Sequence, residues 1–118
     1  MSRRLKDIGD WGEEQACLFL ARQGFKVVER NFHTTTGEID IVARKGGDLF
    51  FIEVKTRTAG ELANDTAVTE FKKHKFGKAV RAYCYKRDTP EIGLIMAGLI
   101  VAVDKINKKV GFRLAVWD

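Results

Sequence analysis

The feature that most constrains the fold is a pair of strand-like segments, EIDIVAR at residues 38–44 and LFFIEVKT at 49–56, joined by KGGD. Both segments are rich in β-branched and aromatic residues, a composition typical of strands. Gly46 and Gly47 lie at the centre of the connection, and Gly-Gly is a recognised two-residue hairpin turn. The segments are therefore predicted to pair as an antiparallel hairpin in one register, because a one-residue slip would exchange their faces.

This register predicts which side chains share a face of the hairpin. The apolar pairs expected on one face are Ile39 with Val54, Ile41 with Ile52, and Ala43 with Phe50. The other face is expected to carry Asp40 directly opposite Glu53. Lys55 follows Glu53 by two residues, so strand alternation points both side chains to the same side. Two carboxylates and an ammonium are thus expected together.

The rest of the chain predicts two helices and three further strands. The helices are expected at residues 7–23 and 69–86, and the strands at 25–29, 98–103 and 110–116. Asp7 or Asp10 is the expected N-cap of the first helix, Gly24 is expected just beyond its end, and Thr69 is expected to cap the second. The second helix is expected to bury a stripe of Phe71, Phe76, Ala79, Val80 and Tyr83.

The element order α-β-β-β-α-β-β indicates an α/β (α+β) fold, with a central mixed sheet flanked by helices. A polar loop is expected at residues 59–65, before the second helix. The length of 118 residues fits one domain, which we expect to span residues 1–118.

Composition favours a location in the cytoplasm. The longest apolar run, residues 93–103, is far shorter than the roughly 20 residues of a membrane helix. The charged segment at residues 1–11 does not resemble a signal peptide. Cys17 and Cys84 lack a CxxC context and are expected to be reduced thiols. No membrane association is expected.

The formal net charge of +5 suits a polyanionic partner such as DNA. Basic residues crowd the second predicted helix and its end: Lys72, Lys73, Lys75, Lys78, Arg81, Lys86 and Arg87. Lys72, Lys73 and Lys75 are the candidates for nucleic-acid contacts on this helix. A row of lysines on a helix is also the common pattern of a solvated face, so both interpretations stay open.

Opposed carboxylates in a sheet repel each other, and a hard divalent cation such as Mg²⁺ relieves that repulsion. Asp40 and Glu53 are the predicted metal ligands, with the Val54 carbonyl as a third. An ammonium at Lys55 can orient water and stabilise charge that develops on a phosphate. Glu13, at the edge of the apolar stripe of the first helix, is expected to support the metal. Together these residues predict hydrolysis of a phosphodiester.

Each of these residues also has an ordinary structural interpretation. Alternating charges such as Glu53 and Lys55 often mark the solvated face of a strand. Glu13 alone is a favourable charge near a helix N-terminus. Thr56 and Arg57 could contact phosphate or simply end the strand. The match of Asp40 to the predicted position opposite Glu53 favours a site.

Several motifs together resemble one known family. They are GEIDIVARKGGDLFFIEVKTR at 37–57, Gly12-Glu13 with Ala16, Gly24-Phe25 followed by Glu29-Arg30-Asn31-Phe32, and Val68-Thr69 with Lys72. In order and spacing they resemble the YraN-like family, which is assigned to the PD-(D/E)xK restriction-endonuclease-like superfamily and is similar to archaeal Holliday junction resolvases. The chain departs from the family pattern at residues 97–99, where Ala-Gly-Leu replaces an RFD-like triplet.

The resemblance implies a restriction-endonuclease-like fold in which Glu13, Asp40, Glu53 and Lys55 form the catalytic set. It also implies Mg²⁺ or Mn²⁺ as the cofactor, and a homodimer that acts on branched or otherwise structured DNA. We therefore expect a metal-dependent DNA endonuclease. Two alternatives stay open: a DNA-binding protein whose nuclease site is inactive or needs a partner, and a non-catalytic structural or interaction domain.

Overall fold

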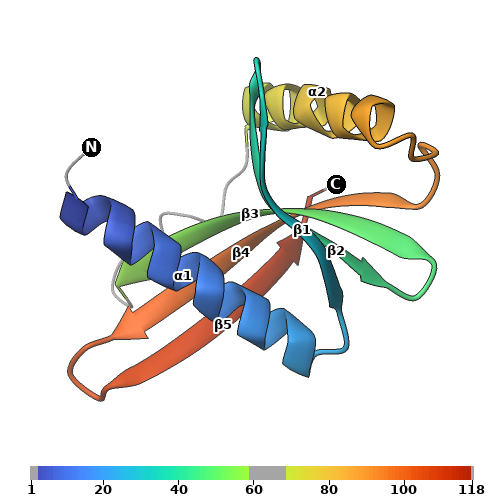
Figure 1. The fold of residues 1–118 in the computed structure, drawn as a ribbon. Helices are drawn as coiled ribbons and strands as arrows, with labels where there is room; N and C mark the ends of the chain where they lie inside the picture. Colours follow the sequence, from blue (N-terminus) through green and yellow to red (C-terminus); the bar gives the residue numbers. More distant parts are fainter. Residues whose placement is uncertain (1–2, 59–68, 118) are drawn as a thin grey trace.

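The computed structural model describes residues 3–58 and 69–117, and within them the predicted order α-β-β-β-α-β-β is confirmed (Figure 1). The elements are α1 (Arg3–Arg22), β1 (Lys26–Thr34), β2 (Gly37–Lys45), β3 (Asp48–Thr58), α2 (Glu70–Lys86), β4 (Leu94–Asp104) and β5 (Lys109–Val116). The polar loop predicted at 59–65 lies outside the described residues.

The strands form one mixed sheet in the order β1-β2-β3-β4-β5. Neighbouring strands are antiparallel except β3 and β4, which run parallel. A parallel pair needs a long crossover connection, and α2 lies within that connection. The predicted mixed sheet with flanking helices is therefore confirmed.

The core has two layers, one on each face of the sheet. Val42 and Phe51 pack with the buried side of α2, whereas their neighbours Ile41 and Ile52 pack with Ala16 and Leu20 of α1. Because alternate residues of a strand point to opposite faces, the two helices cover opposite sides of β2 and β3 (Figure 1). Both faces of these strands are buried where the helices cross them.

The helix ends agree with the sequence in part. Thr69 caps α2, and its hydroxyl accepts the backbone N–H of Lys72 at 3.1 Å. Gly24, with φ +89°, follows the end of α1 as predicted. Asp7 and Asp10 are not caps, because α1 begins at Arg3 and both lie inside it.

Two other predictions about apolar and strand residues need correction. Phe71 does not join the buried stripe of α2, since 77% of it is exposed. The strand predicted at residues 25–29 continues to Thr34 as β1. The register shifts between Val27 and Glu29, and Asn31 has φ +54°. These irregularities interrupt the alternation that would have marked a longer strand.

Neither helix in the described ranges has a segment that is long and apolar enough to cross a membrane. Cys17 is half-buried and Cys84 is buried, and both are free thiols as predicted.

Candidate functional site

The β2–β3 hairpin keeps its predicted register as far as Ile41 and Ile52. The next expected pair, Asp40 with Glu53, does not form, so this prediction is wrong. Instead, Asp40 Oδ2 accepts a hydrogen bond from the backbone N–H of Val54 at 2.7 Å. A side-chain carboxylate thus takes a strand N–H that a backbone carbonyl would otherwise accept. Beyond this point β3 continues beside β4 without β2.

The side-chain alternation of β2 also breaks at Asp40. Ile39 packs in the same layer as Val42, on the α2 side, whereas Ile41 packs on the α1 side. Strict alternation would have placed Ile39 with Ile41. The predicted pairing of Ile39 with Val54 is therefore wrong as well. As a result, the Asp40 side chain lies where β2 and β3 stop pairing.

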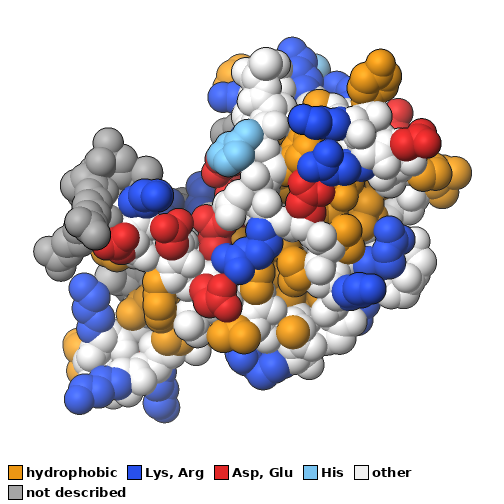
Figure 2. Space-filling model, viewed as in Figure 1, with side chains coloured by type: hydrophobic (Ala, Val, Ile, Leu, Met, Phe, Trp, Pro, Cys, Tyr) orange, Lys and Arg blue, Asp and Glu red, His pale blue; other side chains and the backbone are white. Residues whose placement is uncertain are grey.

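The predicted site residues gather around one pocket of about 510 Å³, where α1 passes the diverging ends of β2 and β3. Its lining residues are Ile8, Gly9, Glu13, Glu38, Asp40, Glu53, Val54, Lys55, Thr56 and Arg57. On the face shown in Figure 2, acidic side chains collect near α1 and the β1–β2 hairpin, with basic side chains around them. Four carboxylates therefore border a single hollow.

Glu13 reaches the pocket because α1 lies very close to β3. Gly12, the residue before it, is buried against Thr56, and a Cβ at position 12 would collide with the Thr56 hydroxyl. No side chain larger than hydrogen fits there unless one element shifts. Gly12 thus determines how near the Glu13 carboxylate comes to the strands.

Asp40 and Glu13 form the buried acidic part of the pocket. Asp40 is only 9% exposed, and burial raises its pKa to about 7, with the nearby Glu13 charge adding to the effect and the Val54 N–H opposing it. Burial also raises the pKa of Glu13. Glu13 Oε1 is buried and has no hydrogen-bond partner in the described part of the chain. A buried carboxylate oxygen without a donor is unfavourable unless a cation or a proton compensates it.

Glu38 is a site residue that the sequence interpretation missed. It lines the pocket, and its hydrogen bond with Asp40 contributes to the raised pKa of Asp40. The His33 Nδ1 atom lies 3.0 Å from the Glu38 carboxylate. Glu38 precedes Asp40 by two residues in the same strand. Because residues two apart in a strand point to the same side, this spacing is the sequence signal for Glu38.

Glu53 has a basic partner from α2. Its carboxylate lies 3.2 Å from the Lys72 ammonium, and both side chains are partly buried. The nearby Lys72 side chain, together with burial, lowers the pKa of Lys55. Of the three lysines predicted to contact nucleic acid, Lys72 therefore reaches the site. Lys73 pairs instead with Glu70 at 3.5 Å.

The remaining predicted residues lie at the rim or outside the pocket. Thr56 and Arg57 line it, and the Arg57 guanidinium donates to the Thr56 carbonyl at 2.9 Å. Lys75 is exposed on α2 and does not line this pocket. The Ala-Gly-Leu departure at residues 97–99 places Gly98 next to Glu53 in the β3–β4 ladder, so β4 contributes no charge at this point.

The donor chemistry fits a hard divalent cation, because the pocket offers carboxylate oxygens, one of them without a partner. The donors are not assembled, however. Of the His, Cys, Asp and Glu side chains within residues 3–58 and 69–117, no three lie close enough together to hold a metal ion. The hydrogen bond from Val54 holds Asp40, and Lys72 holds Glu53. A metal site here requires these side chains to move closer together than they lie in this structure.

Comparison with known proteins agrees with the motifs quoted above. Residues 12–103 match the model of the uncharacterised protein family UPF0102. The chain belongs to this family. A UPF0102 protein of Syntrophomonas wolfei is 38% identical over 107 residues, which cover 86% of this chain and 93% of that one. A UPF0102 protein of Helicobacter pylori is 41% identical and covers 91% of both chains.

A solved structure, the fdxN element excision controlling factor protein of Anabaena variabilis, covers 81% of this UPF0102 chain and 91% of its own. It is 11% identical with a TM-score of 0.34, a likeness too distant to support an inference.

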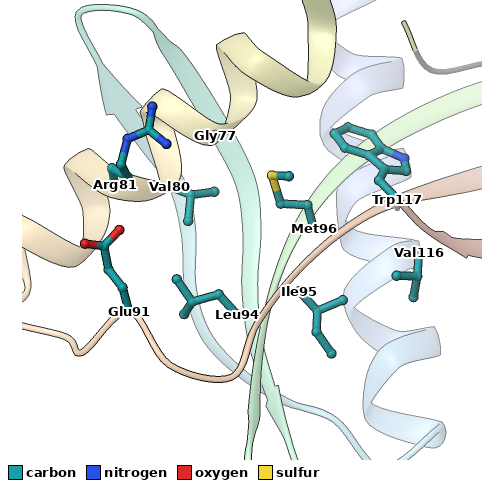
Figure 3. Close-up of a pocket in the computed structure, with 9 residues that line it drawn as sticks. All are labelled: Gly77, Val80, Arg81, Glu91, Leu94, Ile95, Met96, Val116 and Trp117. Carbon is teal, nitrogen blue, oxygen red and sulfur yellow. The ribbon is translucent and has the colours of Figure 1, made fainter. Parts of the chain in front are cut away.

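A second hollow of about 390 Å³ lies between α2, the start of β4 and the end of β5 (Figure 3). Its walls are mainly apolar, with Val80, Leu94 and Met96 among them, and Arg81 and Glu91 stand on one side. This hollow lacks the cluster of carboxylates that could carry metal-dependent chemistry. The acidic pocket is therefore the candidate site in this UPF0102 chain.

Proposed function

We propose that this protein is a metal-dependent endonuclease that hydrolyses phosphodiester bonds in DNA. The observation that carries the proposal is the unpartnered Glu13 oxygen beside Asp40, a buried carboxyl whose pKa is raised to about 7. Buried carboxylates without counter-charges are costly, and functional sites are where such groups concentrate. A divalent cation would supply the missing charge.

Asp40, Glu53 and the Val54 carbonyl are the proposed ligands, and Glu13 supports them from α1. When bound, Mg²⁺ or Mn²⁺ supplies Lewis-acid chemistry that activates water and neutralises phosphate charge. Lys55 orients the attacking water and stabilises the negative charge of the transition state. Thr56 and Arg57, at the rim of the pocket, hold the DNA backbone together with Lys72, Lys73 and Lys75.

The resemblance of residues 37–57 to PD-(D/E)xK nucleases supports the same assignment, because the Asp, Glu and Lys of that pattern all line the pocket. Branched or structured DNA as the substrate, and a homodimer as the active form, follow from the likeness to resolvases. The net charge of +5 suits a DNA partner.

The test is cleavage of a labelled four-way junction, with linear duplex and single strands beside it, in Mg²⁺, Mn²⁺ or EDTA. Wild type is expected to cleave DNA only with metal, and Asp40→Asn and Lys55→Ala to lose cleavage by at least about a hundredfold. Circular dichroism and DNA binding of each variant control for folding. Cleavage that persists in EDTA or in Lys55→Ala would remove this site from the reaction.

One observation favours a second candidate function, DNA binding without cleavage. Glu53 already has a cationic partner in Lys72, and the carboxylates are not gathered around one point. A protein of this kind would bind the junction as tightly in EDTA as in Mg²⁺ and would leave it intact under every condition above.

A further inference from the structure

Lys72 occupies a position that helix stability does not explain. It lies in the first turn of α2, where its backbone N–H is bonded to the cap residue Thr69. The positive end of the helix dipole disfavours a lysine there. The Lys72 side chain instead reaches β3, where its ammonium lies 3.2 Å from the Glu53 carboxylate. This contact with Glu53 gives the residue its counter-charge.

The pair is sheltered from water. The Lys72 side chain is 32% exposed and that of Glu53 is 26% exposed, so solvent screens the pair less than a surface pair. The Lys72 ammonium is close enough to Lys55 to lower the pKa of Lys55. Two ammonium groups therefore lie near the Glu53 carboxylate. By contrast, Glu13 Oε1 has no hydrogen-bond partner among the described residues, and Arg30, whose charge acts on Glu13, is paired with Glu14.

We propose that Lys72 is a tethered cation that neutralises Glu53 while no metal is bound and is displaced from Glu53 when a divalent cation binds. This inference rests on the proposed function, because it takes Glu53 to be a metal ligand. The four-carbon stem of lysine lets the ammonium move without any change in the helix, since Thr69 fixes only the backbone. Lys72 thereby neutralises Glu53 without metal and weakens metal binding.

The test is calorimetric titration of the whole chain with Mn²⁺ in about 0.15 M salt, for wild type, Lys72→Met, Lys72→Arg and Lys78→Met. Lys72→Met removes the competing charge and is expected to lower the Kd for Mn²⁺ roughly three- to tenfold. Lys72→Arg keeps the charge and is expected to bind near the wild-type Kd. Lys78→Met removes the same charge from an exposed site on α2, where salt screens it, and is expected to change the Kd less than twofold.

A metal-free measurement tests the pair itself. In EDTA, Lys72→Met and Glu53→Gln are each expected to lower the melting temperature, and the double variant to lower it by less than the sum of the two. Additive effects in this cycle would overturn the tethered-cation role. If Lys72→Met simply fails to fold, the Lys72→Gln variant, which retains a polar group, serves in the same cycle.

The results separate this inference from the proposed function. Mn²⁺ binding by wild type with an unchanged Kd in Lys72→Met would overturn the tethered-cation role and leave the nuclease proposal standing. Tighter binding in Lys72→Met without DNA cleavage by wild type would support the role and count against the nuclease. Absence of Mn²⁺ binding in wild type and every variant would overturn both.

Discussion

The Asp40 carboxylate and the backbone N–H of Val54 form the contact that joins the two strands of the candidate site, at 2.7 Å. Asp40 belongs to β2, whereas Glu53 and Lys55 belong to β3. The β2–β3 ladder ends at Ile41, so backbone pairing with β2 does not fix the distance from Asp40 to Glu53. Substitutions of Asp40 and of Glu53 can therefore test the contribution of each strand to the stability and activity of the site separately.

The raised pKa of Asp40 predicts how stability depends on pH in EDTA. Between about pH 4 and pH 7 the unfolded chain has lost the Asp40 proton while the folded chain keeps it. The free energy of unfolding therefore falls as pH rises through this window and levels off above pH 7. A shift from 3.8 to about 7 corresponds to a loss on the order of 4 kcal/mol.

The Asp40→Asn variant isolates this effect, because its amide oxygen can still accept the Val54 N–H. Urea denaturation at pH 5 and pH 8 should show that the variant gains stability relative to wild type as pH rises. An equal difference at both pH values would contradict the burial-raised pKa of Asp40.

At pH 8 without metal, Glu53→Gln is expected to lower the free energy of unfolding, whereas Asp40→Asn is expected to raise it. Glu53 is more exposed than Asp40 and has the Lys72 ammonium as a partner. Its neutralisation should cost roughly 0.2–1 kcal/mol, the usual range for a partly exposed ion pair. Thermal melts of Glu53→Gln and Asp40→Asn, measured side by side, test this difference in sign. Stabilisation by both substitutions would mean that the other carboxylates repel Glu53.

Gly12→Ala is expected to destabilise the protein by about 1–3 kcal/mol, although alanine favours a helix, because its Cβ would collide with the Thr56 hydroxyl. The control is Gly9→Ala in the same helix. Its Cβ meets nothing within 4 Å, so it should stabilise by about 0.5–1 kcal/mol. Adding Thr56→Ala to Gly12→Ala should restore much of the loss in urea titrations. No rescue would show that the close approach to Thr56 is not the cause.

Glu38→Gln is expected to lower the pKa of Asp40, because the Glu38 charge and its hydrogen bond both raise that pKa. Carbon-detected NMR titration of the Asp40 carboxyl in EDTA would measure the change. His33→Gln removes the partner of Glu38 but leaves its charge in place, and it serves as the control. A pKa of Asp40 that is the same in wild type and Glu38→Gln would show that the two carboxyls do not interact.

The sequence predicted the element order, the two-glycine turn and the charged residues that line the pocket, except Glu38, because local patterns carry that information. Gly46 and Gly47 specify the hairpin, and Thr69 specifies the start of α2. A register read from the turn holds only while both strands stay regular. It fails at Asp40, where a carboxylate bonds to Val54 in place of the next backbone pair.

Tertiary contacts account for the features that the sequence did not reveal. Lys72, in the first turn of α2, and Glu53, in β3, are separated in the sequence by the end of β3 and the connection to α2. No spacing rule links a helix residue to a strand residue across such a connection. Phe71 precedes Phe76 by five residues, which places it about 140° around the helix from Phe76 at roughly 100° per residue, so it lies off the buried stripe and is exposed. The packing of Gly12 on Thr56 depends on the position of α1 over β3, which only the folded chain defines.

The end of the β2–β3 ladder divides the candidate site into two parts that no backbone pairing joins. On one side of it, β1 and β2 carry Asp40, and on the other, β3 paired with β4 carries Glu53 and Lys55. Movement of the ends of β1 and β2 beyond the last β2–β3 pair, Ile41 with Ile52, would alter the distance between Asp40 and Glu53 without breaking that ladder. A ligand that binds residues of both parts would hold them together. Amide hydrogen exchange at Val54, whose N–H is bonded to Asp40, would report this change.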